Sequence, residues 1–176
     1  MATLYVLSTE TYSGKTAVCV SLGLRMRDDG IDVGYMKPVN MGAVLQAGQP
    51  YDEDVVFMKE VLGLPEPLET LAPVQLTAQR IQALLMGETS GSGFVERLSQ
   101  AYRAVHGQHD VVILEGASNL REGYIVDLAP PDLARDRQCR QLGKLEARRR
   151  LRRHDRTHRR AHRCVTLRNR RLPRPR

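Results

Sequence analysis

The segment from Ser8 to Thr16 constrains the fold more than any other part of the chain. It follows a short apolar run, Leu4 to Leu7, which is typical of a strand, and it closes with the tripeptide Gly14–Thr16. Apolar and small residues then continue to Gly30, and a glycine at such a position commonly ends a helix. The pattern predicts a strand, a loop and a helix in that order.

A loop of this kind binds phosphate because backbone N–H groups and the positive end of the following helix surround the anion. A lysine then reaches the outer phosphates, and the neighbouring hydroxyl binds Mg²⁺. The strict motif has glycine at the position of Thr9, so a tight turn with a solvated lysine is the alternative. We predict that ATP and Mg²⁺ bind here. The residues expected around the phosphates are Thr11, Tyr12, Ser13, Gly14, Lys15 and Thr16.

The rest of the front part of the chain, residues 1–134, has a pattern that predicts a parallel sheet. Ile31 to Pro38 is typical of a second strand, and Asp110 to Glu115 of a third strand that is buried on both faces. Helices are expected over 52–62 and 78–86, and a third has an apolar stripe from Phe94 to Val105. Strands that alternate with helices indicate an α/β fold. We predict a P-loop NTPase-like three-layer parallel sheet that is incomplete, because only three strands precede residue 134.

Composition narrows the class and the location. A chain of 176 residues suits one domain. No apolar run is long enough for a bilayer, and the first residues lack the features of a signal peptide, so we expect a cytoplasmic protein without membrane contact. Cys19, Cys139 and Cys164 form no metal-binding or redox pair in the sequence, and we expect them to be reduced.

The net charge of +7 is divided very unevenly along the chain. Residues 1–134 contain 9 Lys and Arg against 17 Asp and Glu, whereas residues 135–176 contain 18 against 3. The second segment has 17 Arg among 42 residues and no aromatic residue, which is a composition that does not form a packed core. We therefore predict a nucleotide-binding P-loop domain over 1–134 and a disordered or irregular, basic, low-complexity tail over 135–176.

Two interpretations of this tail remain open. An Arg-rich arm could neutralise the phosphates of nucleic acid, but it has no aromatic residues to stack on bases, which disfavours this reading. The preferred hypothesis is a frameshift near Arg135, because shifted frames of GC-rich DNA are rich in arginine and proline codons. The front domain would then be truncated.

Three motifs in the front part resemble the dethiobiotin synthetase family and its relatives. They are the loop Ser8–Thr16, the Val-Gly-Tyr-Met-Lys-Pro-Val stretch at 33–39 and the Val-Val-Ile-Leu-Glu-Gly-Ala stretch at 111–117. The resemblance covers residues 3 to about 134. The family's glycine falls at Ser8, and the threonine that follows it is present as Thr9. The stretch from 94 to 124 is more similar to the nucleotide-binding domain of some phosphotransacetylases and of DRTGG-domain proteins.

The resemblance implies roles for residues outside the loop. Lys37 falls on the family's Lys-Pro lysine, so it joins Lys15 as a candidate catalytic residue that stabilises charge on the group being phosphorylated. Asp54 and Glu115 fall on the metal-binding acids, and with Thr16 they are the candidate Mg²⁺ ligands. A water-exposed lysine and a helix-start acid are the alternative readings of Lys37 and Asp54.

The function that follows is ATP and Mg²⁺ binding by a fragment with weak or no activity. Where dethiobiotin synthetases have Glu-Gly-Ala-Gly-Gly, this chain has Ser118 and Asn119 after Glu-Gly-Ala. The family's substrate-binding glycines are therefore not present. An ATP-dependent, carboxylate-activating ligase of the dethiobiotin synthetase type and a regulatory ATP-binding domain both remain open. A homodimer is also an open alternative, and nucleotide is the expected partner.

The frameshift hypothesis makes a prediction about the coding DNA. Translation of the other two frames after codon 134 should yield, in one of them, a strand rich in Val, Ile and Leu, because a parallel sheet usually has about five strands or more. Sequencing the gene and translating both frames checks this. If neither frame opens with such a strand, the hypothesis is wrong.

Overall fold

The computed structural model describes residues 2–120, 123–126, 128 and 163–167. Strands and helices are interspersed along this length, as in an α/β fold. The elements in chain order are β1 (Ala2–Ser8), α1 (Lys15–Asp28), β2 (Val33–Met36), β3 (Val39–Asn40), β4 (Val44–Gln46), β5 (Gln49–Tyr51), α2 (Glu53–Leu62), α3 (Leu68–Leu71), β6 (Val74–Gln75), α4 (Ala78–Leu85), α5 (Phe94–Gln108), β7 (Val111–Glu115), the 3₁₀ turn η1 (Tyr124–Val126) and β8 (Arg163–Leu167).

The main sheet has the strand order β2-β7-β1-β8, and all of its neighbouring strands are parallel. Strand β7 therefore lies between β1 and β2, although it follows them by many residues in the chain. Val6 pairs with Glu115, and Met36 pairs with Leu114. This register brings the carboxyl ends of the three strands to the same edge of the sheet.

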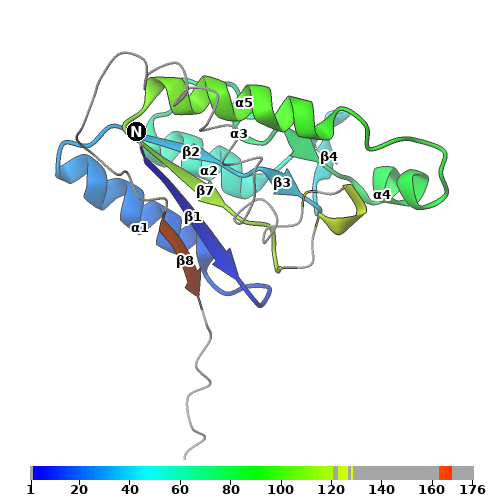
Figure 1. Ribbon diagram of the computed structural model, residues 1–176, viewed down its shortest axis with the longest axis horizontal. Helices are drawn as coiled ribbons and strands as arrows, with labels where there is room; N and C mark the ends of the chain where they lie inside the picture. The colour runs from blue at the N-terminus through cyan, green and yellow to red at the C-terminus, as the bar shows by residue number, and fades with distance from the viewer. Residues whose placement is uncertain (1, 121–122, 127, 129–162, 168–176) are drawn as a thin grey trace, which may run out of the picture.

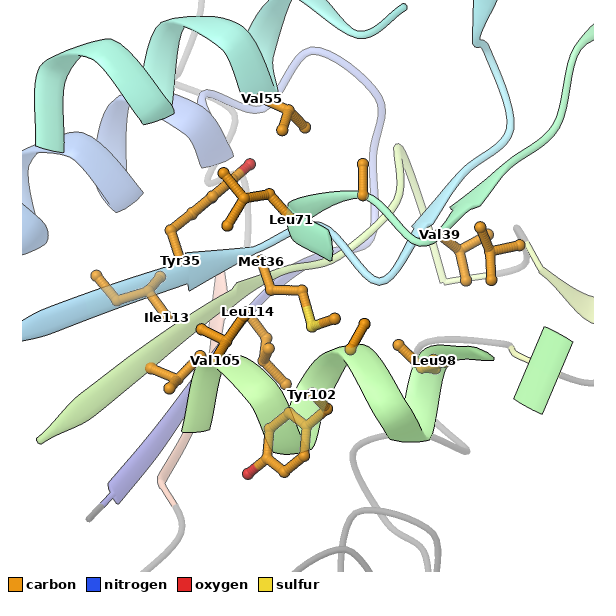
Figure 2. Packing of buried hydrophobic residues seen from close by; sticks show 14 of the residues in the cluster. Tyr35, Met36, Val39, Val55, Leu71, Leu98, Tyr102, Val105, Ile113 and Leu114 are labelled. Carbon is orange, nitrogen blue, oxygen red and sulfur yellow. The ribbon is translucent and has the colours of Figure 1, made fainter. Parts of the chain in front are cut away.

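Helices cover both faces of this sheet, which makes three layers (Figure 1). Helices α1 and α2 lie on one face and α5 lies on the other. Side chains of β2 alternate between the faces, as the pleat of a strand requires. Tyr35 points to the side of Val55 on α2, whereas Met36 points to the side of Tyr102 and Val105 on α5 (Figure 2).

The apolar stripe predicted between Phe94 and Val105 is confirmed. Its five members are all buried, and the helix that carries them continues to Gln108. The helix approaches β2 closely at Gly34, where an added Cβ would lie 2.5 Å from His109 and 2.9 Å from Val105. Glycine at this position therefore lets the helix layer pack against the sheet.

The predicted three-layer α/β architecture is confirmed, with small differences at the ends of elements. The second strand is shorter than predicted and covers only Val33–Met36, and Asp52 caps the helix α2 instead of lying inside it. The two small sheets, β3 with β6 and β4 with β5, were not predicted. Their strands have two or three residues each, which is too short for an alternating pattern to emerge.

Most of the predicted irregular tail, 135–176, lies outside the described residues. The part that the structure describes is β8, which pairs in parallel with β1 and adds a strand that the sequence analysis did not predict. Its sequence includes the β-branched pair Val165 and Thr166, and such residues favour strands. The strand occupies the side of β1 that β7 leaves open, where unpaired backbone groups would otherwise remain.

Within the described residues, none of the helices is long and apolar enough to cross a membrane.

A buried histidine ties together loops at the opposite edge of the sheet, where β2 and β7 begin. His109 lies 2.7 Å from Glu66 through Nε2 and 3.1 Å from Asp32 through Nδ1. Burial alone would lower the pKa of this imidazole, but the two carboxylates outweigh burial and raise the pKa above its ordinary value. The folded state therefore favours the protonated ring.

This cluster predicts a pH-dependent stability. Because the folded pKa of His109 is raised, its contribution is complete below about pH 6.5 and is lost as the pH rises through the folded-state pKa. We expect the free energy of unfolding, measured in urea across this range, to decline with rising pH. His109→Gln should flatten the decline, whereas His106→Gln, a change on the partly exposed part of α5, should keep it. An unchanged slope in His109→Gln would contradict this assignment.

Candidate nucleotide-binding site

Four segments meet at the carboxyl edge of the sheet and enclose a pocket. The loop after β1, the residues after β2, the start of α2 and the end of β7 each contribute to its wall. Ligands of open parallel sheets bind in this region, outside the carboxyl ends of the strands. The pocket has a volume of about 410 Å³. It brings together all the residues that the sequence analysis assigned to the site, namely Thr11, Tyr12, Ser13, Gly14, Lys15, Thr16, Lys37, Asp54 and Glu115.

The loop between β1 and α1 contains two residues with positive φ. Gly14 has φ 80°, in the left-handed region, and Tyr12 has φ 54°, which is uncommon for a residue with a side chain. Left-handed residues that interrupt an ordinary turn direct successive N–H groups into one concavity. The hydroxyl of Ser13 is buried without a hydrogen-bond partner among the described residues. A polar atom in that condition is a candidate contact for a bound ligand.

Lys15 lies inside the pocket and not in solvent. Only 8% of the residue is exposed, and its Nζ donates a hydrogen bond of 3.1 Å to the backbone oxygen of Ser118. This position rules out the alternative of a turn with a solvated lysine. The segment after β7 thus helps to hold the lysine of the loop.

Glu115 is the most deeply buried acid of the site, with 1% of its surface exposed. Thr16 donates to its Oε1 at 2.7 Å, and the hydroxyl of Tyr35 donates to its Oε2 at 2.8 Å. An ionised carboxylate that is removed from water is costly unless hydrogen-bond donors replace the water. One donor belongs to α1 and the other to β2. The carboxylate at the end of β7 is therefore hydrogen-bonded by two different elements.

Burial determines the direction in which the pKa values of Glu115 and its neighbour Cys19 are shifted. Desolvation raises the pKa of Glu115, and the hydrogen bond from Thr16, the charge of Lys37 and the hydrogen bond from Tyr35 oppose the rise without cancelling it. Cys19 lies on α1 beside the same carboxylate. Burial, and then the charge of Glu115, raise the pKa of its thiol strongly, so this cysteine is an inert neutral thiol.

Lys37 is held between two acids. Its Nζ lies 2.8 Å from Asp52 and 2.9 Å from Asp54. Burial alone would lower the pKa of this lysine, but the two carboxylates outweigh burial and raise it. The side chain is therefore neither water-exposed nor isolated, which removes the alternative reading of a solvated strand-end lysine.

The sequence analysis missed two residues that organise the site. Asp52 caps α2 by accepting hydrogen bonds from the backbone of Asp54 and Val55, and it also pairs with Lys37. The position of Asp52 before a helix was the signal for the cap, but no neighbouring residue indicated that its carboxylate pairs with Lys37. Tyr35 was assigned only to a strand, and the pairing of β2 beside β7 is what brings its hydroxyl to Glu115.

The donor set fits a hard cation such as Mg²⁺. Thr16, Asp54 and Glu115 present a hydroxyl and two carboxylates to one pocket, and Mg²⁺ prefers oxygen ligands. No group of three or more His, Cys, Asp or Glu in the described part of the chain could hold a metal ion. In proteins, Mg²⁺ is usually held by one or two carboxylates together with phosphate oxygens of a nucleotide.

The different burial of the two acids around Lys37 makes a prediction about stability. The side chain of Asp52 is 5% exposed. Its loss removes the N-terminal cap of α2 and leaves Lys37 without its buried carboxylate partner. We expect Asp52→Ala to lower the free energy of unfolding by about 3 kcal/mol. Asp54 is 49% exposed, so Asp54→Ala should cost less than about 1 kcal/mol. Urea denaturation measures both, and equal losses would contradict the assignment.

Comparison with known proteins agrees with this geometry. Residues 2–139 match a protein-family model described as an AAA domain (AAA_26). The chain is 34% identical over 120 residues to the ATP-dependent dethiobiotin synthetase of Anaeromyxobacter dehalogenans, a match that covers 68% of this chain and 52% of that protein. It is 33% identical over 141 residues to the protein of the same name from Rhodopirellula baltica, with 76% and 54% covered.

A third relative, the ATP-dependent dethiobiotin synthetase of Methanococcus vannielii, is 28% identical over 130 residues, with 74% of this chain and 58% of that protein covered. The chain thus spans about half the length of the curated relatives it matches. The resemblance to phosphotransacetylases and DRTGG-domain proteins stays a prediction. The family match, together with the loop and acids described above, leads to one conclusion: the chain belongs to the AAA domain family as a dethiobiotin synthetase-like P-loop protein.

Proposed function

We propose that this chain is a P-loop domain that binds ATP together with Mg²⁺. The observation that carries the proposal is the shared pocket in which the loop Thr11–Thr16, Lys37, Asp54 and Glu115 meet. The names of the relatives, which describe ATP-dependent enzymes, support the choice of nucleotide.

The residues of the pocket have distinct roles in this proposal. The loop amides and the N-terminus of α1 receive a phosphate group, and Lys15 neutralises the outer phosphates. Thr16, Asp54 and Glu115 would hold Mg²⁺, which screens the charge of the phosphates when it is bound. If Asp54 binds the metal through Oδ2, its contact with Lys37 must loosen, since that oxygen lies 2.9 Å from the lysine.

The release of Lys37 from Asp54 would give that lysine a second function. Asp52 still holds it at the pocket wall, so its charge remains close to the phosphates. A lysine in this place can stabilise negative charge on a group that accepts a phosphoryl. This supports its assignment, with Lys15, as a candidate catalytic residue of an ATP-dependent ligase.

We further propose that the chain itself has weak activity or none. It spans about half the length of the relatives, whose names describe an ATP-dependent enzyme. The family match ends at residue 139, which supports a boundary near 134 between the P-loop domain and the tail. A frameshift near that boundary remains our explanation. Regulatory nucleotide binding and ligase ancestry are both consistent with the pocket.

Titration with ATP tests the proposed function. Isothermal titration calorimetry of the full chain should detect ATP binding that Mg²⁺ strengthens. Lys15→Ala should weaken binding roughly 10- to 100-fold, since a hydrogen bond to a charged group contributes about 1.5–3 kcal/mol. The matched control is Arg25→Ala, which removes a cation from the exposed part of the same helix. If the wild-type chain binds no ATP, or if both variants lose binding equally, the proposal is wrong.

A further inference from the structure

We infer that Tyr35 is a positioning residue for the metal-binding carboxylate Glu115, an inference that rests on the proposed binding of ATP and Mg²⁺. Its phenol donates to one oxygen of the carboxylate, while the other oxygen accepts from Thr16, the hydroxyl that we propose as a second Mg²⁺ ligand. The tyrosine does not contact the nucleotide itself, because the pocket wall includes Glu115 but not Tyr35.

The geometry gives each carboxylate oxygen its own donor. Tyr35 is completely buried, and its hydroxyl donates to Oε2 of Glu115 at 2.8 Å. Thr16 donates to Oε1 at 2.7 Å. One donor comes from strand β2 and the other from the start of helix α1, so the carboxylate is fixed from two sides of the site.

Two donors are needed because the last torsion of a glutamate side chain has no sharp preference. The terminal rotation of a carboxylate is broad, so a single hydrogen bond leaves its plane poorly defined. With Tyr35 present, the plane is set and Oε1 stays with Thr16. Thr16 is itself a candidate Mg²⁺ ligand. The orientation of Glu115 therefore also decides where the hydroxyl of Thr16 lies.

Packing supports a hydroxyl-specific role for Tyr35. Its ring belongs to the core on the side of α1 and α2, where phenylalanine would fill the same volume (Figure 2). The hydroxyl adds a polar atom to that core, which is costly unless it has a partner. Its partner is the one acid of the pocket that ends a main-sheet strand.

The chain contains a matched control for a tyrosine-to-phenylalanine change. Tyr102 is also buried, and its hydroxyl lies 2.6 Å from the hydroxyl of Thr3. It belongs to α5, on the opposite face of the sheet from Tyr35 (Figure 2). Tyr102→Phe therefore removes a buried tyrosine's hydroxyl contact, in this case with a neutral hydroxyl, at a residue that does not line the pocket.

The experiment compares ATP affinity with and without Mg²⁺ by calorimetry in the full chain. In Tyr35→Phe we expect affinity without Mg²⁺ to stay within about twofold of wild type, and the strengthening by Mg²⁺ to fall roughly tenfold, as expected for one hydrogen bond to a charged group. Tyr102→Phe should keep the full strengthening. A purely structural role for Tyr35 would weaken both affinities together, and that result would overturn the inference.

A double-mutant cycle with Glu115→Gln shows whether the effect passes through that carboxylate. Glu115→Gln alone should reduce the strengthening by Mg²⁺, and adding Tyr35→Phe should change it no further, because residues that act in series are not additive. Additive losses would overturn the inference while the proposed function stands. A wild-type chain that binds ATP without any response to Mg²⁺ would overturn the metal assignment and the inference together.

Discussion

The pairing of β7 between β1 and β2 is the constraint on which the site depends. The three strands come from positions far apart in the chain, and each is followed or ended by a residue of the pocket. Parallel strands direct their carboxyl ends to one edge, so the phosphate loop, Lys37 and Glu115 converge there. An antiparallel β7 would have carried Glu115 to the opposite edge, away from Thr16 and Tyr35.

This convergence concentrates charge in a small volume, and the charges of Glu115 and Lys37 are compensated by nearby groups. Glu115 receives hydroxyl donors from two elements, and Lys37 has a carboxylate on each side. Buried charges that lack partners are costly, whereas pairs that also complete their hydrogen bonds can be tolerated. The site is therefore preorganised before any ligand arrives, and Asp52 contributes to this because the same carboxylate caps α2 and holds the lysine.

The elements with long or strongly patterned segments were predictable from the sequence. The stripe on α5, the apolar run of β7 and the loop before α1 each carry their signal within a few neighbouring residues. The contacts of Tyr35 and Asp52 could not be predicted in this way. Their partners lie 80 and 15 residues away, and only the order of the strands decides that they meet. The strands β3 and β6 could not be predicted because their pairing joins residues far apart in the chain, and the hairpin of β4 and β5 was missed because its strands have only three residues each.

The hydrogen bond from Lys15 to the backbone of Ser118 has a consequence for the cost of binding an anion. A lysine side chain in water samples many rotamers, and fixing them on binding costs up to about 2 kcal/mol of conformational entropy. Here folding has already restricted that freedom, with a neutral carbonyl as the temporary acceptor. An arriving anion therefore meets a lysine whose rotamers are already restricted, so less conformational entropy is lost on binding.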